Sequence, residues 1–102
     1  MVLLSDVFYV YILKCSDGSY YTGHTDNLEK RLAAHNEGEV PGYTLSRRPV
    51  ALVSADTFAT RQDAFERERQ IKGWSRAKKE ALIKGDWDNL IRLAKSGSTG
   101  SP

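Results

Sequence analysis

The stretch from Val7 to His24, VFYVYILKCSDGSYYTGH, decides the fold. Its first half, 7–15, is apolar and rich in β-branched and aromatic residues. A second β-prone stretch, 19–24, follows a Ser-Asp-Gly turn. Two such stretches joined by a short Gly-containing turn are typical of a β-hairpin. The sequence therefore predicts two antiparallel strands at the start of the domain.

The length of the hairpin loop decides which side chains share a face of these strands. A two-residue Asp-Gly turn would place Tyr11 and Tyr21 on opposite faces, because strand side chains alternate. A three-residue loop with Gly18 in the left-handed conformation pairs Tyr11 with Gly23 and brings both tyrosines to one face. We predict the three-residue loop. In that register Gly23, which lacks a Cβ, leaves room beside the Tyr11 ring.

Helix-start signals and composition predict the elements that follow the hairpin. Asp26, with Glu29 three residues later, resembles a capping box that opens a helix running to about Asn36. A loop containing glycine and proline spans 37–46. The composition of 50–56 suits a third strand.

Three further helices are expected in the second half of the chain. Thr60 and Asp63 resemble another capping box, and the helix they open reads to about Gly73. A short helix follows over 75–84, and a last one begins at Asp86. The order of strands and helices predicts an α+β domain with a three-stranded antiparallel sheet flanked by helices.

Length and composition limit the class of protein. At 102 residues the chain suits one domain, expected over 1–95, followed by a flexible Gly/Ser tail over 96–102. The apolar run 7–13 is shorter than the roughly 20 residues of a membrane span, and no signal-type leader is evident, so we expect a cytoplasmic protein. The single Cys15 excludes an internal disulfide, and no Cys/His spacing suits structural zinc.

Basic residues gather in one part of the chain. The net charge of +2 says little by itself. Between residues 61 and 84, however, eight basic residues stand against four acidic ones, and Arg47 and Arg48 lie just upstream. This distribution fits a surface for a polyanion. It also fits two solvated helix faces, so charge alone leaves both interpretations open.

Glu68 lies where an apolar residue is expected. On the helix after Thr60 it falls inside the apolar stripe formed by Ala64, Phe65 and Ile71. A carboxylate that faces the protein body is costly unless it is paired or binds a metal. The residues alone allow an ion pair, with Arg31 or Arg61, or a ligand for Mg²⁺.

The ordered set of Val10-Tyr11, Tyr21-Thr22-Gly23, Arg31 and Glu68 resembles the GIY-YIG nuclease domain in its small stand-alone branch. Ten residues separate Tyr11 from Tyr21 and Tyr21 from Arg31, as in that family. The stretches 43–50 and 70–74 agree as well, so the resemblance covers residues 8 to about 85. The motifs depart from the family name in Tyr-Val-Tyr and in Thr22, and the asparagine that follows the glutamate helix in several relatives has no clear match.

The resemblance implies a metal-dependent endonuclease that hydrolyses phosphodiester bonds in DNA, with structure-specific roles in repair or recombination. The implied catalytic residues are Tyr11, Tyr21, Arg31, His35 and Glu68. Glu68 would hold one Mg²⁺ or Mn²⁺ ion, and no small-molecule cofactor is expected. Tyr11 is the candidate general base, its pKa lowered by Arg31 or by protonated His24, while His35 could relay a proton. The expected nucleic-acid contacts are Gly23, His24, Arg47, Arg48, Lys72, Arg76, Lys78 and Lys79.

Two other functions fit parts of the sequence. The first is a nucleic-acid-binding module that keeps the scaffold and the basic helices but has weak or no turnover. The second is a protein-interaction domain that uses Trp74 and Trp87. Both tryptophans stand at helical core spacing and are expected to be buried, so this second function has less support. The oligomeric state has no sequence signal.

Overall fold

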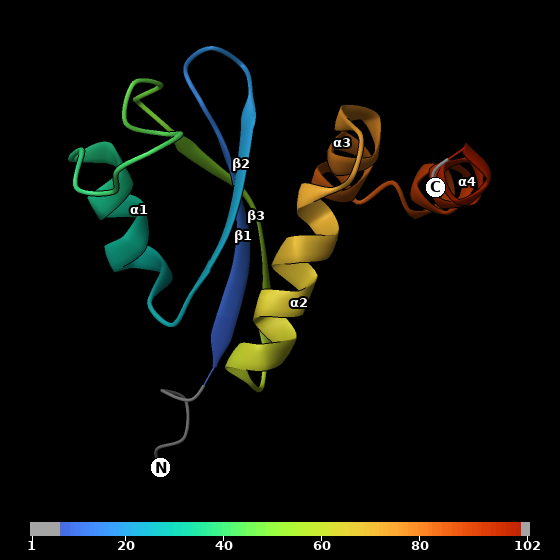
Figure 1. Cartoon of the computed structure of the whole chain (residues 1–102), viewed down its shortest axis with the longest axis horizontal. Helices are drawn as coiled ribbons and strands as arrows, with labels where there is room; N and C mark the ends of the chain where they lie inside the picture. Colours follow the sequence, from blue (N-terminus) through green and yellow to red (C-terminus); the bar gives the residue numbers. More distant parts are fainter. Residues whose placement is uncertain (1–6, 101–102) are drawn as a thin grey trace. The chain divides into compact units, whose positions relative to one another are not determined.

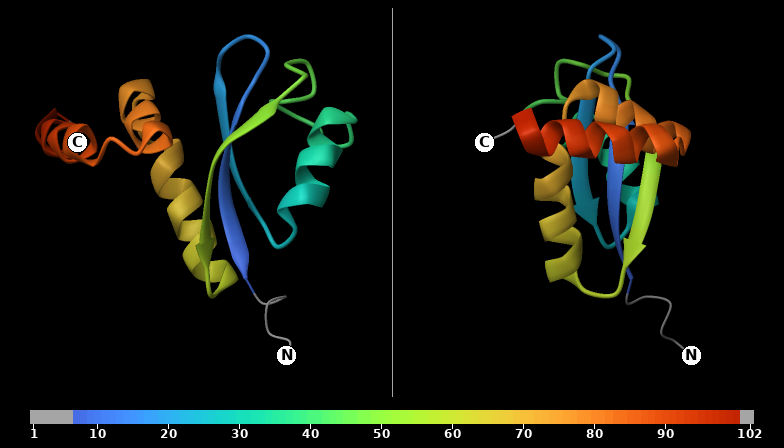
Figure 2. Two further views of the ribbon diagram at one scale, coloured as in Figure 1. Left: turned by 180° about the vertical axis from the view of Figure 1, so that it is seen from behind. Right: turned by 90° about the vertical axis from the view of Figure 1, so that its right-hand side faces the viewer.

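The apolar strand β1 (Phe8–Lys14) lies at the centre of a three-stranded antiparallel sheet. A computed structural model describes residues 7–100, with side chains to residue 94. β2 (Tyr20–Thr25) and β3 (Ala51–Phe58) pair with β1 on either side, in the order β2-β1-β3 (Figure 2). β3 begins one residue later than predicted and continues two residues further. The predicted α+β architecture is confirmed, and β2 is an edge strand.

Two helices of the first part of the chain cover opposite faces of this sheet (Figure 1). α1 (Leu28–Asn36) packs Leu28 and Leu32 on the face that carries Tyr11 and Leu13. α2 (Arg61–Lys72) contacts all three strands from the other side. Because side chains alternate along β1, every central residue of this strand is buried by one helix or the other.

The N-terminus of α1 differs from the prediction by one residue. Asn27, not Asp26, is the N-cap: its backbone is extended, and its side chain accepts a hydrogen bond from the Lys30 N–H over 3.1 Å. The Thr25 hydroxyl accepts from the Asn27 N–H over 3.1 Å and so fixes the chain just before the helix. Asp26 instead pairs with Arg61 at 3.5 Å. The end of α1 at Asn36 is as predicted.

Helix α2 and the loop before β3 are held by side-chain bonds to the backbone. The Thr60 hydroxyl accepts from the Asp63 N–H over 3.1 Å, as the predicted cap requires. The Asn36 side chain bonds to both the N–H and the carbonyl of Val50, over 2.7 and 3.0 Å. This amide ties the end of α1 to the start of β3.

The described chain forms two compact units, one ending at Lys72 and one beginning at Gly73. The second unit contains α3 (Arg76–Lys84), the helix predicted over 75–84, which Ser75 and Gly85 cap, and α4 (Trp87–Gly100). α4 is longer than predicted and covers most of the expected tail, 96–102. Residues 101–102 lie outside the described part, and the flexibility of the tail stays a prediction. No helix within residues 7–100 is long and apolar enough to cross a bilayer.

The burial predicted for the tryptophans is wrong for Trp87. Its side chain is 59% exposed, and Ile91, one turn further along α4, is 57% exposed. Trp74 is half-buried, with Lys78 Nζ 4.4 Å from its ring centroid. The apolar spacing of α4 is present, but α3 is a short helix and leaves the side of α4 that carries Trp87 open within this unit.

Candidate active site

The β1–β2 hairpin has the loop that brings the two motif tyrosines together. Gly18 takes a left-handed φ of 87°, and the strands pair in the register that sets Tyr11 opposite Gly23. This confirms the predicted three-residue loop. The Tyr11 and Tyr21 ring centroids lie 6.4 Å apart, on the face of the sheet that α1 covers.

Gly23 makes room for the Tyr11 hydroxyl. A Cβ at Gly23 would lie 2.5 Å from the Tyr11 hydroxyl oxygen and 2.7 Å from its Cζ. Non-bonded carbon atoms settle at about 3.5–4.0 Å, so such a contact would be repulsive. Tyr11 is only 1% exposed, so its hydroxyl cannot simply turn into solvent. The Tyr11 hydroxyl can therefore occupy this position only because Gly23 has no side chain.

The Tyr11 hydroxyl begins a buried chain of hydrogen bonds that ends at Thr44. It lies 3.0 Å from His35 Nε2, and His35 Nδ1 lies 2.8 Å from Thr44 Oγ1. All three residues are buried. His35 belongs to the last turn of α1, while Thr44 belongs to the loop that follows, so both segments hold the imidazole.

Burial sets the protonation of Tyr11 and His35. It raises the pKa of Tyr11 to about 12, although Arg31 beside the hydroxyl acts in the opposite direction. Burial also lowers the pKa of His35 below its ordinary value of 6.5, and the charge of Arg31 lowers it further. Arg31 lowers the pKa of Tyr11, as predicted, but desolvation of the phenolate outweighs it, so the pKa does not approach neutrality. At neutral pH both groups are uncharged.

Arg31 lies one turn before His35 on α1, with its guanidinium beside Tyr11. Its Nε is buried and has no hydrogen-bond partner among the described residues. A hollow of about 360 Å³ borders Arg31 and is also lined by Asn27 and Lys30. Arg31 thus keeps donor capacity for an anion.

Glu68 faces the sheet from α2, as its place in the apolar stripe predicts. It is 8% exposed. Its Oε1 lies 2.5 Å from His24 Nδ1, and its Oε2 lies 2.5 Å from Lys72 Nζ. The expected partners Arg31 and Arg61 are wrong: Arg31 lies on the α1 side of the sheet, whereas Lys72 follows Glu68 by one turn on the same helix.

The Glu68 carboxylate has the chemistry of a ligand for a single hard cation. Burial raises the pKa of Glu68, but hydrogen bonds from His24 and Lys72 outweigh this effect and bring the pKa below its ordinary value of 4.5. The group is therefore ionised at neutral pH. Mg²⁺ often binds one or two carboxylates and keeps several waters. Within the described part of the chain, no three His, Cys, Asp or Glu side chains gather into a larger metal site.

The tyrosine group and the glutamate group meet across β2. Tyr21 and Gly23 face α1, whereas Thr22 and His24 alternate with them and face α2. Lys72 Nζ, which contacts Glu68, lies 6.0 Å from the Tyr21 ring centroid. The charge of Glu68 also contributes to the raised pKa of Tyr11. Tyr11, Tyr21, Arg31 and His35 therefore lie on the α1 face of the sheet, and Glu68, on the α2 face, is near enough for its charge to act on Tyr11.

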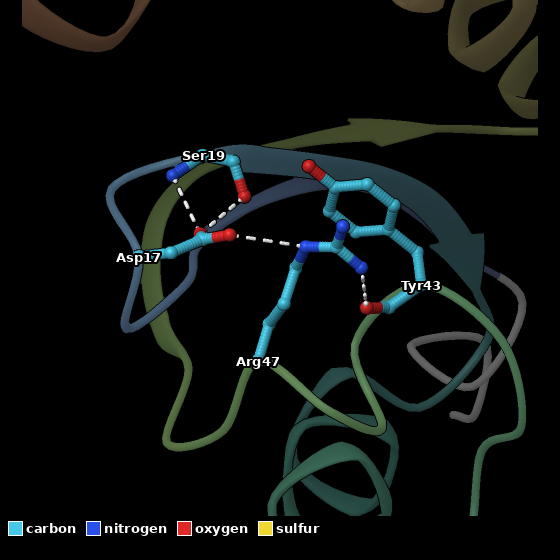
Figure 3. Close-up of polar contacts among 4 residues, drawn as sticks. All are labelled: Asp17, Ser19, Tyr43 and Arg47. Carbon is cyan, nitrogen blue, oxygen red and sulfur yellow. Dashed lines mark hydrogen bonds and ion pairs between the residues drawn. The ribbon is translucent and has the colours of Figure 1, made fainter.

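Arg47 joins the hairpin loop to the loop after α1 (Figure 3). Its Nε donates to Asp17 Oδ2 over 3.1 Å, and its Nη1 donates to the Tyr43 carbonyl over 2.8 Å. Its guanidinium carbon lies 3.9 Å from the Tyr43 ring centroid. The backbone N–H of Arg47 donates to the Thr44 carbonyl over 3.0 Å. Arg47 thus anchors the segment that carries Thr44, a role that the sequence did not predict.

The other predicted nucleic-acid contacts are divided between the two units. Arg48 Nε donates to the Leu45 carbonyl over 2.9 Å, and its guanidinium packs beside Gly38. Arg76, Lys78 and Lys79 belong to α3 in the second unit. Nucleic-acid binding by these residues stays a prediction.

The sequence analysis also missed other contacts of this site. The four-residue spacing of Glu68 and Lys72 is that of neighbours on a helix face, so this pair had a readable signal. Thr44 had none, because it reaches His35 through an irregular loop. Tyr43, which stacks on Tyr21 with ring centroids 6.2 Å apart, comes from the same loop.

Comparison with known proteins agrees with this arrangement. Residues 7–81 match the model of the GIY-YIG catalytic domain. The chain belongs to the GIY-YIG family. This is a nuclease domain, whose members act on nucleic acid and generally use divalent metal ions.

The similar proteins of the GIY-YIG family are small. A UPF0213 protein of Staphylococcus saprophyticus is 50% identical over 78 residues, which is 76% of this chain and 95% of that protein. A UPF0213 protein of Bacillus pumilus is 48% identical over 75 residues, 74% of this chain and 76% of that protein. The solution structure of protein EF2693 from E. faecalis is 40% identical, with a TM-score of 0.54 over 78% of this chain and 84% of that one.

Proposed function

We propose that this GIY-YIG protein is a divalent-metal-dependent endonuclease that hydrolyses phosphodiester bonds in DNA, with a structure-specific role in repair or recombination in the cytoplasm. The observation that supports this is the surroundings of Tyr11: its hydroxyl bonds to His35, Arg31 lies beside it, and the charge of Glu68 acts on it. Hydrolysis needs an acceptor for a water proton, donors for the phosphate charge and a ligand for a cation. These side chains supply all three.

Arg31 and Tyr21 bind and orient the scissile phosphate. The guanidinium of Arg31 presents a planar fork of donors that matches phosphate oxygens, and among the described residues its Nε has no hydrogen-bond partner to give up. Tyr21 is half-buried next to Tyr11 and positions the phosphate or the attacking water.

Tyr11 and His35 act together as the proton acceptor. A lone Tyr11 with a pKa of about 12 is not ionised at neutral pH. As a water oxygen bonds to phosphorus, the bond from phosphorus to the leaving DNA oxygen breaks, and its electron pair stays on that oxygen. One water O–H bond also breaks, and its proton moves to the Tyr11 oxygen. The Tyr11 proton moves at the same time to His35 Nε2, 3.0 Å away. Neutral His35 becomes an imidazolium, and no free phenolate forms.

Glu68 is the residue that holds the divalent ion, Mg²⁺ or Mn²⁺. When bound, the ion supplies positive charge that stabilises the leaving oxygen. The side chain of Lys72 is 50% exposed, so it is free to turn from Glu68 toward a phosphate. His24 remains as a neighbour that keeps the carboxylate in place.

The direct test is a cleavage screen with the wild-type chain. Linear duplex, single-stranded and branched DNA are each incubated with Mg²⁺, with Mn²⁺ and with EDTA. We expect cleavage of at least one substrate with a divalent ion and none with EDTA. Cleavage that persists in EDTA would contradict the metal dependence, and cleavage of all substrates at one rate would contradict a structure-specific role.

A second candidate is a nucleic-acid-binding module without turnover on the same scaffold. The observation that favours it is that both carboxylate oxygens of Glu68 already have cationic or donor partners, Lys72 and His24. DNA binding without cleavage of any substrate in the same screen would support this candidate.

Reversing Lys78 and Lys79 to glutamate is expected to weaken DNA binding. Both side chains lie on α3, and two fewer phosphate contacts should lower the slope of log K against log salt by about 2. Affinity is measured by fluorescence anisotropy between low and moderate salt.

The matched control reverses Lys84 and Arg92, two exposed cations of the same unit. It changes the net charge equally, so it removes the same long-range attraction. We expect the Lys78/Lys79 variant to bind more weakly than this control. Equal affinities would show that α3 presents only a solvated charged face. Melting curves of both variants check that each one is folded.

A further inference from the structure

The buried hydroxyl of Tyr11 has one acceptor to which it can donate. A buried tyrosine O–H almost always finds a hydrogen-bond partner. Arg31 stands beside the Tyr11 oxygen as a cation, so it donates to the oxygen and accepts nothing. Among the described residues, the ring nitrogen at 3.0 Å, His35 Nε2, is the acceptor that remains.

This direction of donation decides the tautomer of His35. The imidazole is neutral, so one of its nitrogens carries a proton and the other accepts. Since Nε2 accepts from Tyr11, the proton must be on Nδ1. The Nδ1–H then donates to Thr44 Oγ1, 2.8 Å away. Neutral imidazole in water favours the opposite, Nε2-protonated form, so the protein must hold the less common one.

Thr44 is held in a fixed position, from which it can stabilise the less common tautomer of His35. It is 1% exposed, and its carbonyl accepts the backbone N–H of Arg47 over 3.0 Å. The side chain of Arg47 binds the neighbouring Tyr43 carbonyl and also Asp17 in the hairpin loop (Figure 3). The hydroxyl of Thr44 is thus carried on a segment anchored at two points.

We propose that Thr44 is a positioning residue that holds His35 in the Nδ1-protonated form, so that Nε2 faces Tyr11 as a proton acceptor. The inference rests on the proposed function only for its catalytic consequence. With the other tautomer, Nε2–H would point at the Tyr11 oxygen, and the tyrosine could not pass its proton on. Thr44 touches neither substrate nor metal and acts through His35.

The test reads the tautomer directly by NMR. Protonated and unprotonated imidazole nitrogens have well-separated ¹⁵N shifts, and long-range ¹H–¹⁵N spectra assign them. The chain has two histidines, so the spectrum of a His24→Gln variant identifies the signals of His35. We expect wild-type His35 at neutral pH to be protonated on Nδ1. A wild-type spectrum with the proton on Nε2 would overturn the proposal without any variant.

Three substitutions isolate the hydroxyl of Thr44. Thr44→Val keeps the shape but removes the hydroxyl, and we expect the Nε2-protonated form to appear. Thr44→Ser keeps the hydroxyl and should keep the wild-type spectrum. The matched control is Thr22→Val, since Thr22 Oγ1 is also buried but has no hydrogen-bond partner in the described part of the chain. An unchanged His35 spectrum in Thr44→Val would contradict the proposal.

Cleavage kinetics provide the second measurement. A general acid–base group contributes about 10²–10⁴-fold to the rate of catalysis. We therefore expect Thr44→Val to lower kcat by about tenfold or more and to leave KM nearly unchanged. Thr44→Ser should recover the rate, and Thr22→Val should not lower it. A correct wild-type tautomer in a protein that cleaves nothing would leave the assignment of Thr44 standing and reject only the nuclease function. Normal kcat in Thr44→Val would reject the catalytic role of Thr44.

Discussion

Glu68→Gln is expected to abolish metal-dependent cleavage while the domain stays folded. Glutamine keeps the volume of the side chain and one acceptor oxygen, but it removes the negative charge that a hard cation requires. We expect cleavage to fall by roughly 10³-fold or more, the scale seen when a main stabiliser of transition-state charge is lost. Binding of Mn²⁺ to the protein should weaken in parallel, which gives a measurement independent of turnover.

The same substitution separates a metal ligand from a structural ion pair. The partners Lys72 and His24 have side chains that are 50% and 22% exposed, so water can replace much of what Glu68 gives them. The expected loss of stability is therefore small, on the order of 1 kcal/mol. The matched control is Glu66→Gln, on the exposed side of α2. A Glu68→Gln variant that melts early yet still cleaves would reject the metal assignment.

The hairpin could be predicted because its signals are local. Ser-Asp-Gly suits a two-residue or a three-residue loop, and once the three-residue loop is chosen, period-two alternation fixes which side chains face each other. From that register alone, Tyr11 and Tyr21 share a face and Gly23 lies beside Tyr11. The inward direction of Glu68 was predictable for the same reason, since the helical period places it among apolar positions.

The environment of these residues could not be predicted, because it depends on contacts between distant segments. The pKa of Tyr11 shows this most clearly. The sequence indicated a nearby cation, Arg31, which favours a lowered pKa. The degree of burial decides the direction of the net pKa shift, and it raises the pKa of Tyr11 to about 12. The partners of Glu68 were misjudged because Arg31 lies on the other face of the sheet from α2.

The second half of the chain shows the limit of periodicity. The spacing of apolar residues correctly predicted a helix at α4, but it does not predict which segment covers those residues. Trp87 and Ile91 remain mostly exposed, at 59% and 57%. A periodic stripe predicts a helix with an apolar side, whereas burial of that side needs a partner of sufficient length.

Gly23→Ala is expected to disable the site although it replaces no catalytic side chain. The new methyl group would lie 2.5 Å from the Tyr11 hydroxyl oxygen, and Tyr11 is only 1% exposed. We expect a loss of stability of about 1–3 kcal/mol from overpacking. Displacement of the hydroxyl from His35 should lower cleavage by about 10²-fold or more, because a shift of about 1 Å can cost that much.

A double variant tests whether the contact with Tyr11 is the cause. Tyr11→Phe removes the atom nearest to the new methyl group, so Gly23→Ala should destabilise this background less than the wild type. Gly18→Ala is the control for glycine replacement: it adds a methyl group in open space at a left-handed φ, so it should cost stability but keep cleavage. Chemical denaturation and cleavage assays on the four variants give the comparison. An equal cost of Gly23→Ala in both backgrounds would mean that the overpacking comes from the ring of Tyr11, whose Cζ would lie 2.7 Å from the new methyl group in either background, and not from its hydroxyl.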